Sequence, residues 1–377
     1  MKIKRLKAQT ILSSNGTKTI EITVNGKYTA SAPSGTSKGK YEVRSFPSTG
    51  VPTSVVNRTL SKKLIGIKIG EFNDLEQVEG VLNEYGFNKV GGNTVVAIEF
   101  ALLKAISNNE LWSYLNNSVD IMPKLLGNCV GGGAHFKGES TDFQEFLIQP
   151  EVSSVRDADI INKKIYSKIG EVSKAKQKTL EGAWVLQQNS EDVFKMIDKI
   201  SYDIANRFGI RVHMGADIAA NTLFKNNLYH YKNKMRSKDE QLEYVNGLVD
   251  RFNLKYIEDP VMEEDFEGYG EIKAKLVCGD DLVCTNLKRL ESAKEYISAV
   301  IVKPNQVGSL IETKKLVDYA KANGIVTVMS HRSGETMDTT IADLAVGWEI
   351  PYIKCGIVGK ERVVKLNRLK NIEKNIK

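Results

Sequence analysis

The sequence predicts an α/β protein in two parts, an N-terminal α+β domain over residues 1–122 and an α/β barrel over residues 123–377. Two β-rich runs joined by a turn signal open the chain, and segments with helical periodicity follow them to about residue 116. Beyond that point, short apolar, β-branched runs alternate with helical stretches, a pattern typical of βα repeats with parallel strands. The length of 377 residues also suits two domains.

The first domain begins with the runs TIEITV and KYTASAP on either side of Asn25-Gly26, a dipeptide that favours hairpin turns. We therefore expect two antiparallel strands within residues 1–45. Helical periodicity follows in SVVNRTLSKKLIG, NDLEQVEGVLNEYG and NTVVAIEFALLKAI, with Gly and Asn near the ends of these segments. We place the domain boundary at Pro123, which follows a polar turn.

Six consecutive predicted strands of the second domain each end in an ionisable residue. In chain order these residues are Asp217, Glu258, Asp280, Lys303, His331 and Lys354. They are 41, 22, 23, 28 and 23 positions apart, and the spacings in the twenties fit one strand, one helix and two short loops. Because a barrel places the C-terminal ends of its parallel strands on one face, we expect these side chains to meet at one mouth.

The three acids of this set favour a magnesium site. One acid after a strand is usually only the cap of the next helix, but burying six ionisable groups together without a cation or an anionic ligand would leave charges unpaired. Carboxylates are the ligands that Mg²⁺ prefers, and no zinc-type His or Cys stands beside them. Asp259 and Asp281 are interpreted as structural neighbours. The segment around Gly35 lacks the spacing of a Walker A loop, and no G-x-S-x-G elbow is present.

The composition excludes several classes of protein. The chain has 53 Lys and Arg against 46 Asp and Glu, a net charge of +7, and is 41% hydrophobic, which excludes disordered and collagen-like chains. Its four cysteines form no C-x-x-C pair, so we expect free thiols in a reducing cytoplasm. Neither a signal peptide nor a membrane span is expected. The scattered basic residues favour a small anionic substrate over specific nucleic-acid binding.

Read with their neighbours, the strand ends resemble the enolase (phosphopyruvate hydratase) family over nearly the whole chain. The resemblance is carried by APSGTSKGKYE, NTVVAIEFALLKA, GGGAHFKG, DFQEFLIQP, MGADIAAN, YIEDP, GDDLVCTNLKR, VKPNQVGSLIET, MSHRSGETMDTTIADLAVG and IKCG…ERVVKLNRL. It implies an N-terminal α+β cap on a modified eight-stranded, TIM-like α/β barrel. It also implies a cytoplasmic carbon–oxygen lyase of glycolysis, a homodimer or higher homo-oligomer, that dehydrates 2-phosphoglycerate to phosphoenolpyruvate with Mg²⁺.

The resemblance further implies a role for each site residue. Asp217, Glu258 and Asp280 match ligands of the first metal ion, and Ser37 matches the loop serine that completes a second metal site. Lys303 matches the base that takes the C2 proton, and Glu181 matches the acid that helps the 3-hydroxyl leave. The other matching positions surround the substrate or hold its phosphate: Lys354, His331, Glu145, His135, Gln144, Arg332 and Ser333.

The chain is a short and somewhat divergent match. Where the family usually reads G-D-E-G-G, this sequence has Leu180 directly before Glu181 and Trp184 shortly after it. An alternative hypothesis is therefore an enolase-like paralogue with weak, altered or no activity and a binding role. A racemase or cycloisomerase branch is disfavoured, because its K-x-K motif is matched only by Lys174-Ala-Lys176 in a polar, helix-like stretch.

Overall fold

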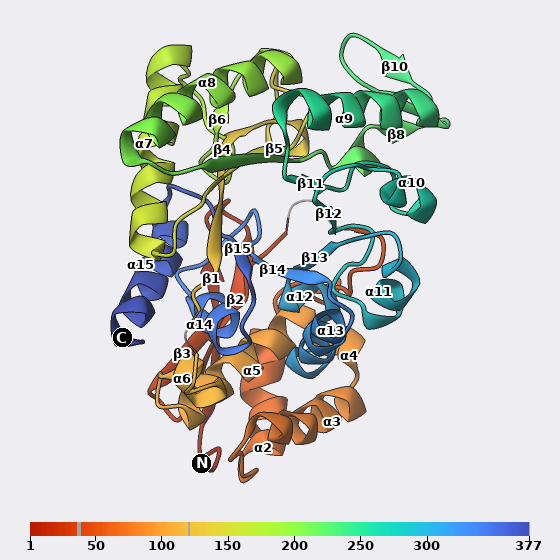
Figure 1. The fold of residues 1–377 in the computed structure, drawn as a ribbon. Helices are drawn as coiled ribbons and strands as arrows, with labels where there is room; N and C mark the ends of the chain where they lie inside the picture. Colours follow the sequence, from red (N-terminus) through yellow and green to blue (C-terminus); the bar gives the residue numbers. More distant parts are fainter. Residues whose placement is uncertain (36–38, 120, 377) are drawn as a thin grey trace.

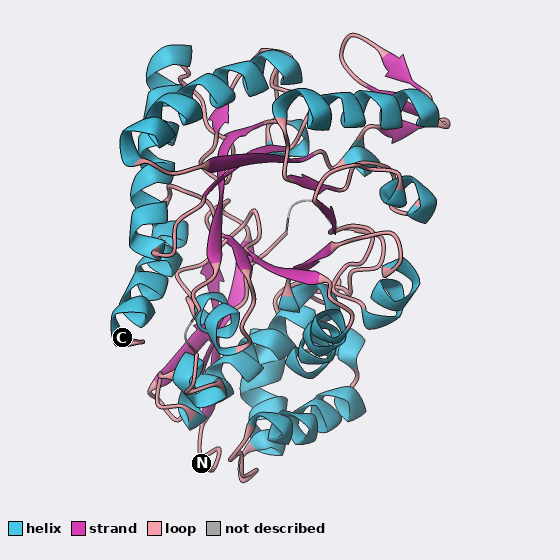
Figure 2. Cartoon of the chain, in the orientation of Figure 1, coloured by secondary structure: helices cyan, strands magenta, loops and turns pink. Residues whose placement is uncertain are grey.

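The computed structural model describes residues 1–35, 39–119 and 121–376. A small domain of one sheet and several helices lies at one side of a larger α/β barrel (Figure 1). The strands of the barrel surround its centre, and helices lie outside them (Figure 2). We propose to divide the chain between residues 122 and 123, in the connection from the last helix of the small domain to the first strand of the barrel.

The N-terminal sheet has three antiparallel strands in the order β1 (Leu6–Leu12), β2 (Lys18–Val24) and β3 (Tyr28–Ser31). The expected hairpin joins β2 to β3, and Asn25 and Gly26 both have the positive φ that such a turn requires. The two expected strands are β2 and β3, and a third strand that was not expected, β1, pairs along the other edge of β2. Few of its side chains are buried, so its sequence lacks a clear alternation of apolar and polar residues.

The helical part of this domain agrees with the sequence periodicity. Its helices are α1 (Thr53–Val55), a π-helical turn (Val56–Leu60), α2 (Ser61–Leu64), a 3-10 turn (Phe72–Asp74), α3 (Leu75–Tyr85), α4 (Phe87–Val90), α5 (Gly92–Ile106) and α6 (Leu111–Leu115). α5 is buried along nearly its whole length, between the N-terminal sheet and α12 of the barrel domain. An apolar helix of this kind joins the cores of the two domains.

Eight of the described strands close the barrel. They are β4 (Lys124–Gly131), β5 (Glu145–Pro150), β7 (Val212–Asp217), β11 (Tyr256–Glu258), β12 (Leu276–Gly279), β13 (Ala299–Val302), β14 (Val326–Ser330) and β15 (Tyr352–Lys354). The pairing of β15 with β4 completes the ring. Two short elements complete the strands of this domain: β6 (Trp184–Val185), which adds to β4, and a small separate sheet of β8 (Phe224–Lys225), β9 (Leu228–His230) and β10 (Met235–Arg236).

The expectation of parallel strands throughout the barrel was wrong for β5, which runs antiparallel to both β4 and β7. Residues 132–144 connect β4 to β5 with only a 3-10 turn, Gly133–His135. This connection contains no α-helix that could cross over and return the chain in parallel, and β5 runs back antiparallel beside β4. This is the modification of the eight-stranded barrel.

Helices of the barrel domain follow most of the strands. They are α7 (Val155–Ser173), α8 (Ser190–Phe208), α9 (Lys238–Phe252), α10 (Phe266–Gly270), α11 (Leu287–Ala293), α12 (Pro304–Val307), α13 (Leu310–Ala322), α14 (Thr340–Gly347) and α15 (Lys360–Asn375). Ser309 caps α13 by accepting a hydrogen bond from the Glu312 amide. The last helix, α15, lies against α7 and α14 (Figure 1).

The interior of the barrel is filled by a separate cluster of side chains from its strands, including Leu147, Ile301 and Tyr256. All four cysteines are buried and none forms a disulfide. Within the described residues, no helix is both long and apolar enough to cross a membrane.

Candidate active site

One cavity at the C-terminal ends of the strands collects most of the side chains that the sequence singled out. Asp217 and Lys354 are the last residues of their strands, and Asp280, Lys303 and His331 directly follow theirs. The cavity is lined by His135, Gln144, Glu145, Glu181, Asp217, Asp280, Lys303, Ser330, His331, Arg332, Ser333 and Lys354. Of the predicted set, Glu258 is fully buried in contact with Lys354, and Ser37 lies outside the described residues.

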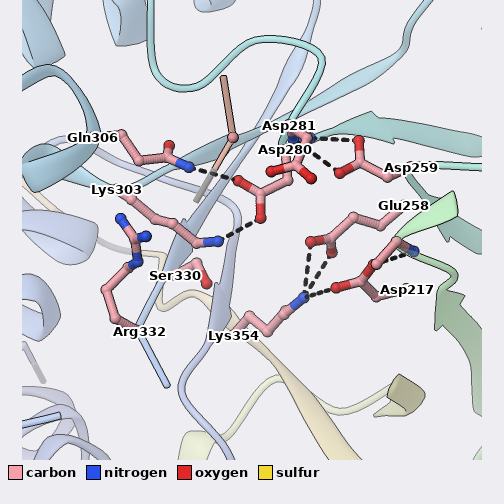
Figure 3. A network of polar contacts seen from close by, with 12 residues as sticks. Asp217, Glu258, Asp259, Asp280, Asp281, Lys303, Gln306, Ser330, Arg332 and Lys354 are labelled. Carbon is pink, nitrogen blue, oxygen red and sulfur yellow. Dashed lines mark hydrogen bonds and ion pairs between the residues drawn. The ribbon is translucent and has the colours of Figure 1, made fainter. Parts of the chain in front are cut away.

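Lys354 connects three of the acids. Its Nζ lies 2.8 Å from Glu258 Oε2 and 3.2 Å from Asp217 Oδ2 (Figure 3). The same atom lies 3.0 Å from Glu145 Oε2. Burial alone would lower the pKa of Lys354, but Glu145 and the other two carboxylates raise it well above its usual value. Burial, followed by the charge of Asp217, raises the pKa of Glu258. Three acids thus share one ammonium group, which leaves the cluster short of positive charge.

Lys303 pairs with the remaining acid of the predicted metal set. Its Nζ donates to Asp280 Oδ2, and Gln306 Nε2 donates to Asp280 Oδ1 at 2.8 Å (Figure 3). Burial would lower the pKa of Lys303, but Asp280 outweighs it, so the ammonium form is favoured in this arrangement. The backbone amide of Lys303 donates to Thr285 Oγ1 at 2.9 Å, which positions the base of the side chain.

Asp259 orients the loop that carries Asp280, as expected of a structural neighbour. Its Oδ1 accepts hydrogen bonds from the Asp280 amide at 2.9 Å and the Tyr269 hydroxyl at 2.7 Å, and its Oδ2 accepts from the Asp281 amide at 2.8 Å. Single oxygens of Asp259, Asp280 and Asp281 lie within 4.8 Å of one another. This acidic group can hold a metal ion, as can a second group made of His135, Glu145 and Glu181.

Glu181 lies within the cavity despite the altered residues around it. Its Oε2 is 3.3 Å from His331 Nε2, and its Oε1 is 3.9 Å from His135 Nδ1. Burial raises the pKa of Glu181, but the two histidines outweigh burial and hold it well below its usual value. Leu180 is 44% exposed, and Trp184 stacks on Tyr166 outside the cavity lining. The departures from the family pattern therefore leave this carboxylate among the site residues.

Arg332 receives support from the N-terminal domain. Its Nη2 lies 2.9 Å and 3.0 Å from the two carboxylate oxygens of Glu42, and its Nη1 donates to Asn305 Oδ1 at 3.1 Å. A Cβ at Gly35 would lie only 2.0 Å from Arg332 Nη2, so a residue without a side chain is required for this approach. The N-terminal domain thus holds Arg332, a residue of the cavity lining, through Glu42.

Family comparisons agree with this architecture in both domains. Residues 3–115 match the model described as "Enolase, N-terminal domain", and residues 119–377 match the one described as "Enolase, C-terminal TIM barrel domain". The chain belongs to the enolase family. Similar curated proteins include the enolase of Picrophilus torridus, with 36% identity over 99% of both chains, and that of Methanocorpusculum labreanum, with 38% identity over 97% of this chain and 98% of its own. The enolase of Archaeoglobus fulgidus is 36% identical over 99% of this chain and 97% of its own.

Three polar residues of this enolase-family site were not identified by the sequence analysis. Glu42, Asn305 and Gln306 contact Arg332 or Asp280, yet none of them ends a predicted strand. Glu42 is the last residue of the motif APSGTSKGKYE, and Asn305 and Gln306 belong to VKPNQVGSLIET, so the sequence singles out both stretches. The positions within each stretch that face the site are decided by the fold.

In metal-free buffer, we expect the unfolding temperature to fall between about pH 6.5 and about pH 7.5, around the raised pKa of Asp259. Burial raises the pKa of Asp259 to about 7, and burial also raises that of Glu258. A carboxyl whose pKa is higher in the folded chain stabilises the fold while protonated, and this contribution is lost as pH rises from the unfolded value through the folded one. Burial lowers the pKa of His135 and of His331, so both are largely neutral in this window.

Calorimetry with a chelator measures this effect, and the same scan with millimolar Mg²⁺ is the control. A bound cation would offset the repulsion between the ionised acids, so the fall should shrink. An unfolding temperature that rises across this window in metal-free buffer would contradict the prediction.

Proposed function

We propose that this chain catalyses the Mg²⁺-dependent dehydration of 2-phosphoglycerate to phosphoenolpyruvate. The observation that carries the proposal is that the cavity of this enolase-family chain brings together Lys303, Lys354 and Arg332 with a cluster of buried carboxylates. Removing a proton next to a carboxylate adds negative charge to an existing anion, so catalysis needs fixed positive charge where that charge develops.

We assign the role of general base to Lys303. A lysine accepts a proton only when neutral, so its contact with Asp280 has to weaken before it can act. Positive charge nearby lowers the pKa of a lysine, and Lys354 supplies one such charge from the same cavity. Loss of the paired Asp280 charge would therefore move Lys303 toward the neutral form.

Asp217, Glu258 and Asp280 are the proposed ligands of Mg²⁺. The donor chemistry suits the ion, because these oxygens belong to buried carboxylates, which among the described residues form ion pairs with Lys303 and Lys354. When bound, the ion would neutralise negative charge on the substrate carboxylate. Ser37 is proposed for a second ion. With the ion bound, the Lys354 ammonium would add positive charge beside the negative charge that forms when the C2 proton is removed.

Arg332 and Ser333 are the proposed phosphate-binding residues, and Gln144, Glu145, His135 and His331 are proposed to surround the rest of the substrate. A guanidinium matches phosphate oxygens in a bidentate manner. Glu42 and Asn305 already hold the Arg332 guanidinium from two directions, which reduces the conformational freedom lost on binding.

Glu181→Gln is expected to lower the rate at which the 3-hydroxyl leaves by about 100-fold. Exchange of the C2 proton should stay measurable, because the two steps use different groups. The low pKa of Glu181, which the two histidines hold down against burial, means that the carboxylate has to be protonated before it can donate. Deuterium exchange into 2-phosphoglycerate and phosphoenolpyruvate formation are measured on one sample. Glu171→Gln, an exposed acid of α7, is the control, and equal loss of both steps would contradict the assignment.

The proposed function is tested by the growth of phosphoenolpyruvate absorbance when 2-phosphoglycerate and Mg²⁺ are added to the protein. The expected result is turnover that a chelator stops and Mg²⁺ restores. A folded, substrate-binding protein without turnover would favour the paralogue with a binding role.

We also propose a cytoplasmic homodimer or higher homo-oligomer. Buried, unpaired cysteines suit a reducing compartment. Leu12 and Met337, exposed by 66% and 57%, line one surface depression between the two domains, and such apolar exposure suits contact with a second copy. Light scattering of the wild type and of Leu12→Lys measures this, and a monomeric wild type would contradict it.

A further inference from the structure

Two buried basic side chains of α15 are not used by the proposed chemistry. Arg362 and Lys365 are only 2% and 1% exposed, and both belong to the ERVVKLNRL stretch, to which the sequence analysis assigned no role. Buried Arg and Lys side chains are rare unless they are paired. Their partners lie in the segment 332–336, which follows β14 and His331 and includes both proposed phosphate-binding residues.

Arg362 holds one peptide unit of this segment. Its Nη2 donates to the Ser333 carbonyl oxygen at 3.1 Å and lies 3.5 Å from that of Arg332. On its other side, the same peptide unit donates through the Gly334 amide to the Ser34 carbonyl at 2.8 Å. Since the C=O and N–H of a trans peptide point in opposite directions, the orientation of this unit is set from both sides.

Lys365 holds the end of the segment. Its Nζ donates to the Thr336 carbonyl at 2.9 Å and pairs with Glu335 Oε2 at 2.8 Å. Glu335 in turn accepts hydrogen bonds from the amides of Arg332 at 3.1 Å and Thr336 at 3.0 Å. The ion pair between α15 and Glu335 is therefore linked to the main chain at both ends of the segment.

The backbone around α15 makes room for these contacts. Gly356 has a φ of +75°, and a Cβ there would lie 2.6 Å from Arg362 Cδ. This glycine precedes the helix and lets the arginine stem pass toward the segment. Lys365 also donates to the Glu361 carbonyl of its own helix at 2.8 Å, which fixes its ammonium group.

We propose that Arg362 and Lys365 are positioning residues, which hold the main chain of segment 332–336 so that Arg332 and Ser333 meet the phosphate of the substrate. The proposal rests on the proposed function. Bidentate recognition of phosphate depends on the placement of the guanidinium plane, so a shift of the supporting main chain weakens binding without removing any group that contacts the substrate.

Arg362→Lys tests the proposal, with Arg368→Lys as a matched control. Arg368 lies on the same helix, but it binds Asp343 of α14 through Nε at 3.0 Å and Nη2 at 2.6 Å. Both variants keep the charge. We expect Arg362→Lys to raise KM for 2-phosphoglycerate about tenfold. The value of kcat should change less than about threefold, because the proposed base, Lys303, follows β13 and is not held by segment 332–336. Arg368→Lys should leave both constants unchanged.

Backbone amide exchange with deuterium gives a readout that does not depend on turnover. Segment 332–336 should exchange faster in Arg362→Lys than in the wild type, and at the wild-type rate in Arg368→Lys. If the wild type does not turn over 2-phosphoglycerate, the proposed function fails, while the exchange rates still report whether α15 holds the segment.

The proposal is overturned if Arg362→Lys keeps the wild-type KM and exchange rate, even when its unfolding temperature falls, because the arginine would then serve stability alone. If this variant does not fold, Glu335→Gln replaces it in both measurements. That change keeps the side-chain size and removes the ion pair with Lys365, so a wild-type KM and exchange rate would overturn the proposal equally.

Discussion

Replacing Lys303 with alanine is expected to lower the rate of 2-phosphoglycerate dehydration by a factor on the order of 10³ or more, because a general base contributes about 10² to 10⁴ to the rate. Exchange of the C2 proton should be lost to the same extent, since both depend on the first proton transfer. The measurements are phosphoenolpyruvate absorbance and deuterium incorporation into the substrate.

Loss of the lysine also leaves Asp280 without its ion-pair partner, so Lys303→Gln is measured beside it. The amide can still donate to Asp280, which separates loss of the base from loss of the contact. Lys321→Ala, an exposed lysine paired with Glu349, controls for removal of a lysine elsewhere. Wild-type deuterium exchange in Lys303→Ala would show that another group is the base.

Glu258→Gln is expected to abolish the stabilisation of the fold by Mg²⁺. A ligand that binds only the folded chain at 100 times its Kd adds about 2.7 kcal/mol to the free energy of unfolding, so the wild type should show a clear rise in melting temperature. Glu258 is fully buried, and its two oxygens accept from Lys354 while one also accepts from Tyr256. An amide cannot reproduce a carboxylate that accepts at both oxygens.

Glu267→Gln, which removes an exposed acid of α10, is the matched control for this experiment and should keep the full Mg²⁺ response. Thermal unfolding is recorded with a chelator and with increasing Mg²⁺. The ligand assignment would be wrong if Glu258→Gln and the wild type showed the same shift in melting temperature.

Much of the fold was predictable because local patterns carry it. The hairpin at Asn25-Gly26, the helices between residues 53 and 115, and the six ionisable strand ends all follow from periodicity and turn chemistry within a few residues. The strands that were misjudged lack such signals. β1 shows little alternation, and the direction of β5 depends on the absence of a crossover helix rather than on its own residues.

The candidate site divides in the same way. Residue type and position at the strand ends are enough to predict that Asp217, Glu258 and Lys303 lie together. The resemblance adds Glu181, but the sequence leaves open whether its altered neighbours displace it. The fold decides that point, because Leu180 is exposed to solvent and Trp184 packs on Tyr166.

By itself, the sequence determined the family, the barrel and the chemical types of side chain at its mouth, since these depend on hydrophobic periodicity and on residues a fixed number of positions apart. Only the tertiary structure decided which partners each charged side chain contacts. The pairing of Lys354 with three acids, of Arg332 with Glu42 and of Arg362 with the segment after β14 joins residues far apart in the chain. Such contacts depend on packing between elements, and no local pattern in the sequence encodes them.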